Sequence, residues 1–257
     1  MSEGRNKLAA FDWPALVQKV RERTPARLLE GRSGAAYRTA TQMELRDAHA
    51  AARDAVRTEL HLQRDFGPAF VEQWNLFEVN TRARDKDEYL LRPDLGRRLS
   101  EESRAHVSEL CPREQDLQIL IGDGLSVTAV VKQAPPLLPL LHAEAQSRQW
   151  SVGRCFCVRY CRVGLLNDIG EVLAPRVAIL LIGERPGLAT AESLSAYLAY
   201  RPSKAHTDAD RNLISNIHDR GTLPGQAATR IADLAAQMMK VRSSGFSLRE
   251  QSPALER

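Results

Sequence analysis

The residues whose types and spacing suit ligand binding lie in three short segments, and each segment directly follows a predicted strand. The strands are predicted at 117–121, 152–160 and 176–182, and the segments after them are 122–126, 161–164 and 183–188. In an open α/β sheet, ligands bind in the crevice beyond the carboxyl ends of the strands. Glycines in these turns allow the backbone to approach a ligand closely. The sequence therefore predicts a ligand crevice formed by the three segments, with Glu184 at its rim.

Two interpretations of the first segment stay open. Gly122 and Gly124 match the first two glycines of a dinucleotide-binding loop, although the third glycine is missing. In a dinucleotide-binding fold, an acidic residue at the end of the second strand holds a ribose hydroxyl. This sequence has Arg159 and Arg162 there instead, and they could bind the 2′-phosphate of NADP. A stand-alone NADP-type Rossmann oxidoreductase is therefore an alternative function. The other interpretation is a tight turn between a strand and a helix.

Cysteine and histidine spacing raises the question of a metal site. Cys155 and Cys157 fall on one face of a predicted buried strand, Cys161 follows, and no second cluster supplies a fourth ligand. His218 lies in a loop similar to the D-x-H-x-x-G loop whose histidine replaces the lower ligand of cobalamin, but Asn216 stands where the aspartate is needed. We therefore predict no metal ligands: the thiols pack as small apolar groups, and His218 bonds to backbone at a helix end.

No complete set of catalytic residues can be assembled from the sequence. Hydrolase-elbow, P-loop and HExxH motifs are absent, and Asp123 with Ser126 has no histidine partner at a recognisable spacing. The sequence thus predicts no catalytic residue on this chain. It favours a subunit that binds a ligand or completes a site formed with another chain.

The elements that must position these segments fall into two regions. Residues 1–115 are polar and mainly helical, and helices are predicted at 8–23 and 41–62. A β-hairpin is predicted in which 76–79 faces 89–91 across a charged turn. Residues 116–257 alternate apolar strands with helices, which is typical of a parallel sheet covered on both faces.

The predicted fold class is therefore α/β: a Rossmann-like, mostly parallel sheet with flanking helices, preceded by a mainly helical N-terminal region with a β-hairpin. The predicted domains are 1–115 and 116–257. Within the second region we expect a further strand at 196–200 and several helices, the first of them interrupted by Pro135 and Pro136. These helices are predicted at 127–149, 164–173, 208–217 and 226–241.

Composition narrows the classes of partner. No apolar run is long enough to span a membrane, and the first residues lack the apolar core of a secretory signal, so we expect a reducing cytosol. The net charge is +4, but the 36 basic residues are scattered among 32 acidic ones and aromatic residues make up only 5%. This mixture favours ion pairs over a nucleic-acid surface, although an arginine-rich nucleic-acid binder is a further alternative.

An ordered set of segments resembles the small (light) subunit of ethanolamine ammonia-lyase from about residue 7 to 250. The segments are GRSG at 31–34, RPDLGRRLS at 92–100, DGLS at 123–126, RV at 162–163, IGE at 169–171, LIGERPGL at 181–188, ESLS at 192–195, DR at 210–211 and ISNIH at 214–218. Each segment alone is weakly specific, but the ordered set is highly specific.

The resemblance implies an adenosylcobalamin-dependent lyase that converts ethanolamine to acetaldehyde and ammonia. It implies a separate large subunit with the substrate site and the catalytic residues, and a hetero-oligomer in which small subunits project from a core ring of large subunits. The cofactor would lie between the two chains. The family implies a bacterial microcompartment as the location, and free cytoplasm is the alternative because the N-terminal extension is short. No nucleic-acid or membrane partner is implied.

Three cofactor-binding residues follow from the resemblance, position by position: Val163, Glu184 and Leu213. Val163 would present backbone and a methyl surface, and the Glu184 carboxylate would accept hydrogen bonds from corrin amides or the ribose hydroxyl. Leu213 stands where the family often has cysteine, so a backbone contact is expected there rather than a thiol. Asp123 and Ser126 are expected as neighbours of the cofactor.

Overall fold

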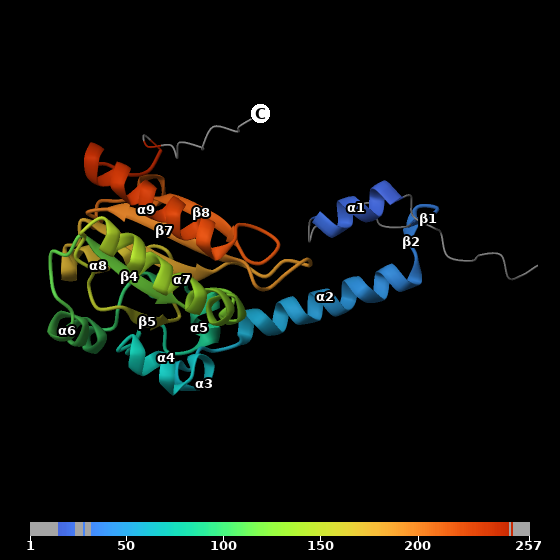
Figure 1. The fold of residues 1–257 in the computed structure, drawn as a ribbon. Helices are drawn as coiled ribbons and strands as arrows, with labels where there is room; N and C mark the ends of the chain where they lie inside the picture. The colour runs from blue at the N-terminus through green and yellow to red at the C-terminus, as the bar shows by residue number, and fades with distance from the viewer. Residues whose placement is uncertain (1–14, 24–27, 29–31, 247, 249–257) are drawn as a thin grey trace, which may run out of the picture.

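A six-stranded sheet forms the centre of the protein (Figure 1). The computed structural model describes residues 15–23, 28, 32–246 and 248. The strand order is β3-β5-β4-β6-β7-β8. The strands are β3 (Glu78–Asn80), β4 (Leu117–Gly122), β5 (Phe156–Arg159), β6 (Val177–Gly183), β7 (Leu194–Tyr200) and β8 (Asn212–Ile217).

The pairing of the strands confirms a mostly parallel sheet. β3, β5, β4 and β6 pair in parallel, whereas β6, β7 and β8 pair antiparallel. Every residue of β4 and β6 is buried, which is why β6 is a continuous apolar run and β4 is apolar apart from Gln118. The sheet therefore has flanking helices on both faces of its parallel half, as the strand–helix alternation predicted.

One face of the sheet is covered by α7 (Val127–Ser147) and α9 (Pro224–Val241) (Figure 1). The predicted interruption at Pro135 and Pro136 is wrong, because α7 runs through them without a break. Leu137 and Leu138 beside the prolines are completely buried in the core. Packing of this face stabilises the helix although prolines lack the backbone N–H.

The opposite face is covered by α6 (Glu101–Leu110) and α8 (Leu165–Leu173). The Ser100 hydroxyl caps α6 by accepting a hydrogen bond from the Ser103 N–H. The helix α8 begins directly after the predicted segment 161–164 and contacts β6. The sheet thus separates two apolar clusters, one on each face.

The position of the predicted hairpin is wrong. Residues 78–80 form β3, which pairs in parallel with β5, and residues 89–91 lie in α5 (Lys86–Leu91). The Asp85 side chain caps α5 by accepting a hydrogen bond from the Glu88 N–H, and Tyr89 is completely buried. A two-stranded hairpin does occur in the N-terminal region, between β1 (Arg32–Ser33) and β2 (Ala36–Tyr37).

The predicted helix at 208–217 is also wrong. This segment contains a short 3-10 helix, η2 (Asp208–Asp210), followed by β8, which extends the sheet antiparallel to β7. Ile214 and Ile217 of β8 are buried against α9, whereas Leu213 faces the other way and is 44% exposed. Strand pairing with β7 therefore overrode the helical pattern of the segment.

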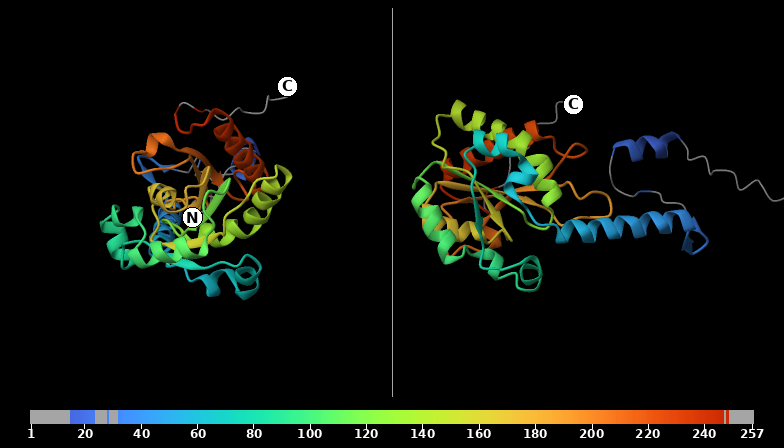
Figure 2. Two further views of the ribbon diagram at one scale, coloured as in Figure 1. Left: turned by 90° about the vertical axis from the view of Figure 1, so that its left-hand side faces the viewer. Right: turned by 90° about the horizontal axis from the view of Figure 1, so that it is seen from below.

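The N-terminal region begins outside the body of the protein. Helix α2 (Thr39–Arg57) extends away from the body, and α1 (Ala15–Arg23) also lies away from it, above the outer part of α2 in Figure 1 and in the right view of Figure 2. Residues 8–14 of the predicted helix 8–23 lie outside the described residues. Closer to the sheet are α3 (Leu62–Phe66), α4 (Pro68–Gln73) and the 3-10 helix η1 (Leu95–Arg97). The division at residue 115 stays a prediction, and the sheet takes its edge strand β3 from before it.

Many arginines pair with nearby acids, as the mixed composition predicted. These ion pairs include Arg57–Asp87, Arg82–Glu101, Arg84–Glu88, Arg92–Asp94 and Arg176–Asp116. Exposed pairs of this kind stabilise a fold by at most about 1 kcal/mol each. They neutralise surface charge but contribute little to the stability of the fold. Within the part of the chain that the structure describes, no helix has the length and apolar character needed to cross a membrane.

The half-buried His142 of α7 is expected to make the stability of the fold depend on pH. His142 of α7 lies against Trp74, with 4.6 Å between ring centroids, and its Nε2 atom is buried without a hydrogen-bond partner. Burial lowers the pKa of His142 below its ordinary value of 6.5. The His142 side chain is therefore protonated less readily in the folded protein than in the unfolded chain.

We expect the contribution of His142 to stability to be fully present above pH 6.5 and to decline as the pH falls below that value. His142→Phe keeps a ring against Trp74 and removes the titration. Melting temperatures measured between about pH 5 and 7.5 should therefore fall less steeply in the variant. Identical slopes in the two proteins would contradict this explanation.

Candidate functional site

The three predicted segments meet at one hollow at the carboxyl ends of β4, β5 and β6. The hollow has a volume of about 180 Å³. Its lining includes Tyr89, Leu125, Val163, Glu184, Ser195 and Tyr197. The structure thus confirms that the segments after these three strands form a common crevice, and it adds side chains from α5 and β7.

The loop after β4 packs tightly against the loop after β6. Gly124 has a φ of +56°, and a Cβ atom there would lie 2.6 Å from the carbonyl oxygen of Gly183. The Leu125 N–H donates to that same carbonyl at 3.2 Å. Ser126 caps α7 by accepting a hydrogen bond from the Ala129 N–H. Gly124 is therefore needed for loop packing, and the loop satisfies its own polar groups without a ligand.

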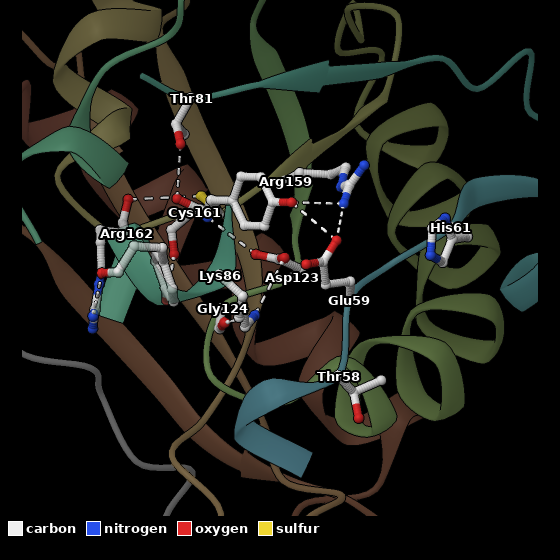
Figure 3. Close-up of polar contacts among 12 residues, drawn as sticks. Thr58, Glu59, His61, Thr81, Lys86, Asp123, Gly124, Arg159, Cys161 and Arg162 are labelled. Atoms are coloured by element: carbon white, nitrogen blue, oxygen red, sulfur yellow. Dashed lines mark hydrogen bonds and ion pairs between the residues drawn. The ribbon is translucent and has the colours of Figure 1, made fainter. Parts of the chain in front are cut away.

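A buried ion pair lies beneath the hollow (Figure 3). The carboxylate of Asp123 is completely buried and accepts a hydrogen bond from the Cys161 N–H at 3.1 Å. Lys86 Nζ lies 3.4 Å from Asp123 Oδ2 and donates to the Gly124 carbonyl oxygen at 3.1 Å. Burial raises the pKa of Asp123, and the charge of Lys86 opposes that shift. The pair ties α5 to the loops after β4 and β5.

Two arginines that could have accepted a 2′-phosphate are occupied by protein contacts. The Arg162 guanidinium lies 4.2 Å from the centroid of the Tyr89 ring and donates to the Tyr89 carbonyl oxygen at 3.3 Å. Arg159 forms an ion pair with Glu59 and a hydrogen bond of 2.7 Å with the Tyr160 hydroxyl (Figure 3). The structure therefore offers no specific support for a dinucleotide in this crevice.

Glu184 stands where three strands come together. Its Oε1 atom accepts hydrogen bonds from the Ser195 hydroxyl at 2.7 Å and from the Asn216 N–H at 2.9 Å. Both partners belong to the antiparallel half of the sheet, and no arginine pairs with this carboxylate among the described residues. Because both contacts use Oε1, the Oε2 atom retains its capacity to accept a hydrogen bond from a ligand.

The three predicted cofactor-binding residues differ in their position relative to the hollow. Val163 and Glu184 line the hollow, whereas Leu213 does not. Leu213 instead pairs with Tyr197 in the register of β7 and β8, and Tyr197 does line the hollow. Side chains of directly opposed residues share a face of the sheet, so Leu213 extends this surface outward by one strand. Their contact with a cofactor stays a prediction.

Lys86, Tyr89 and Tyr197 are site residues that the sequence did not reveal. The first two fell in the wrongly predicted hairpin, and no spacing indicates that Lys86 meets Asp123 across 37 positions. Asp123 and Ser126, expected as neighbours of a cofactor, lie beneath the hollow and at the helix cap respectively. Their roles in the described structure are to hold the loops.

The cysteine thiols and the side chain of His218 are buried in the protein interior. Cys155 and Cys157 share one apolar cluster, as one-face placement predicted, and burial raises the pKa of Cys155 to about 12. His218 is 3% exposed; its Nδ1 accepts from the Arg220 N–H and its Nε2 faces the Asn216 side-chain oxygen. It follows a strand rather than ending a helix. No group of three or more potential metal ligands occurs among the described residues.

Comparison with known proteins identifies one family. The family model described as ethanolamine ammonia-lyase light chain matches residues 14–249. Curated proteins called ethanolamine ammonia-lyase small subunit are similar over nearly the same range. One from Clostridium perfringens is 41% identical over 90% of this chain and 76% of its own length, and one from Fusobacterium nucleatum is 42% identical with the same coverage. One from Clostridium acetobutylicum is 39% identical over 91% of this chain and 94% of its own length.

The buried pair should show strong energetic coupling. Lys86→Met leaves the Asp123 carboxylate buried without its counter-charge, and such losses cost about 3–5 kcal/mol of unfolding free energy. In Lys86→Met/Asp123→Asn the side chain at 123 is neutral and its amide oxygen still accepts from the Cys161 N–H. We therefore expect the double variant to be more stable than Lys86→Met alone in denaturant titrations.

Arg57→Gln/Asp87→Asn provides a matched control, because this ion pair is exposed on both sides. Its double-mutant cycle should give a coupling below about 1 kcal/mol. Additive effects of the Lys86 and Asp123 substitutions would show that the buried pair does not tie the loops together.

Proposed function

Because this chain belongs to the ethanolamine ammonia-lyase light chain family, we propose that it is the small subunit of a two-chain ethanolamine ammonia-lyase that binds adenosylcobalamin with its large subunit. The proposed reaction is the radical deamination of ethanolamine, or a related vicinal amino alcohol, to an oxo compound and ammonia. Adenosylcobalamin supplies the radical chemistry when bound. This chain contributes binding groups and no catalytic residue.

The observation that supports a shared cofactor site is the shape of the crevice. Its volume of about 180 Å³ is well below the roughly 300–1,000 Å³ of sites that enclose a drug-sized ligand. The surface continues past the hollow, because Tyr197 is only half-buried and Leu213 is 44% exposed on the face of the sheet opposite α9. A chain that covers part of a large cofactor, with a second chain covering the rest, would present such a surface.

The residues of the crevice fit the chemistry of a corrin with amide side chains. Glu184 would accept a hydrogen bond from an amide N–H or the ribose hydroxyl through Oε2, while Ser195 and Asn216 hold Oε1 in place. Val163 would supply an apolar contact. Leu213, with no thiol, would supply packing and a backbone contact.

The proposal extends to assembly and location. The large subunits would form a core ring that carries the small subunits outside. The proposed location is a bacterial microcompartment, with free cytoplasm as the alternative. Sedimentation of the tagged chain with shell particles, compared with its recovery in the soluble fraction, would decide between the two.

Ammonia release from ethanolamine should require both chains and adenosylcobalamin. We expect neither this chain nor the large subunit alone to sustain turnover, and mixing or co-expression should restore it. Enzyme-coupled detection of ammonia provides the measurement. Turnover by this chain alone would overturn the proposal, and reduction of a carbonyl substrate with NADPH would favour the oxidoreductase alternative.

Glu184→Gln tests the cofactor contact directly. The glutamine oxygen can still accept from Ser195 and Asn216, but an NH₂ group replaces Oε2 and the charge is lost. A hydrogen bond to a charged group contributes about 1.5–3 kcal/mol, so the apparent affinity for adenosylcobalamin should weaken roughly ten- to a hundredfold. Turnover at saturating cofactor should change less.

Glu192→Gln is the matched control, since Glu192 lies in the same connection and pairs with Lys132 at 2.6 Å outside the hollow. It should leave cofactor affinity unchanged. If Glu184→Gln lowers the melting temperature or the yield of complex while the cofactor affinity of the surviving complex stays the same, Glu184 only links the strands.

A further inference from the structure

A second, strongly basic hollow lies at the beginning of α8. Its volume is about 350 Å³. It is lined by η1, by the first turn of α8 and by the connection between β7 and β8. Its basic lining residues are Arg97, Arg98, Lys204, His206 and Arg211. None of these side chains lines the proposed cofactor crevice.

The acids that line this hollow are already neutralised. Asp168 accepts a hydrogen bond from the Leu99 N–H and forms an ion pair with Arg104. Asp208 forms an ion pair with Arg211. Arg97 and Arg98, by contrast, make no ion pair among the described residues. The hollow therefore has an excess of positive charge, which favours an anionic ligand.

Two residues that line the hollow have buried polar atoms without hydrogen-bond partners. The Arg211 side chain is only 3% exposed and is held by Asp208 and by the Asn167 side-chain oxygen, at 2.9 Å from Nη2. Its Nε atom is buried without a hydrogen-bond partner, and so is Nδ1 of His206. Unpaired buried polar atoms are uncommon in folded proteins because each loses its hydration. Arg211 and His206 both line the hollow beside the two unpaired arginines, so its lining has donor capacity that the protein does not use.

We propose that this hollow is a phosphate-binding site. Guanidinium groups match phosphate oxygens in a bidentate geometry. Arg97, the last residue of η1, and Arg98, which follows it, both line the hollow. Gly164 lets Arg97 pack closely, because a Cβ atom at position 164 would lie 2.9 Å from the Cγ atom of Arg97. The phosphate group belongs to a free phosphate or to the phosphodiester in the tail of cobalamin; only the second source rests on the proposed function.

Inorganic phosphate is the probe, titrated into the full chain and into its complex with the large subunit without cofactor. Calorimetry should show saturable binding of one phosphate per chain. Arg97→Gln and Arg98→Gln should each weaken this binding about tenfold or more. Arg92→Gln removes the same charge outside the hollow, where Arg92 pairs with Asp94, and should leave binding unchanged.

Absence of saturable binding, or equal weakening by Arg92→Gln, would overturn the phosphate site. The phosphate site would also be overturned if the Arg97 and Arg98 variants bound phosphate normally and lost only assembly with the large subunit. The arginines would then serve a protein interface. Competition between adenosylcobalamin and phosphate would assign the cofactor tail as the source, and independent binding would assign free phosphate; either result supports the site. Because phosphate is titrated without cofactor, failure here is distinguishable from failure of the Glu184 test.

Discussion

The geometry of the crevice depends on one buried charge, the Asp123 carboxylate. A buried carboxylate must be paired and hydrogen-bonded, because its desolvation is otherwise too costly. Asp123 meets this requirement through the Cys161 N–H and Lys86, and each partner comes from a different part of the chain. Satisfying one carboxylate therefore sets the relative positions of two loops at the ends of β4 and β5 and docks α5 against them. The hollow above is a consequence of that arrangement.

The antiparallel half of the sheet gives the crevice its third side. Because β7 and β8 return beside β6, Ser195 and the Asn216 N–H reach Glu184 at the end of β6. An exposed carboxylate on a loop would sample many rotamers, and holding it would cost conformational entropy on binding. The two hydrogen bonds to Oε1 already restrict the Glu184 side chain in the folded protein. Less conformational entropy is therefore lost when Oε2 binds a ligand.

The described arginines differ in whether an acidic group neutralises them. Most of those in the body face a nearby acid or an aromatic ring, as Arg159 and Arg162 do beside the crevice. Arg97 at the end of η1 and Arg98 after it have no acidic partner among the described residues and line a hollow together with His206 and Arg211. Composition treats all arginines alike, but an arginine without an acidic partner keeps its charge available for a ligand.

The sequence by itself determined the buried strands, the loops that follow them and the family. Continuous apolar runs such as 177–183 can be stable only between two covered faces, and in a parallel sheet the loops after them must meet at one edge. Tertiary structure alone decided the rest. Residues 89–91 became helical because burying Tyr89 and capping at Asp85 outweighed their strand pattern, and 212–217 became a strand because β7 offered an edge. The Lys86–Asp123 pair and the Glu184 contacts left no trace in spacing, because they join residues that are distant in sequence and meet only after the sheet has formed.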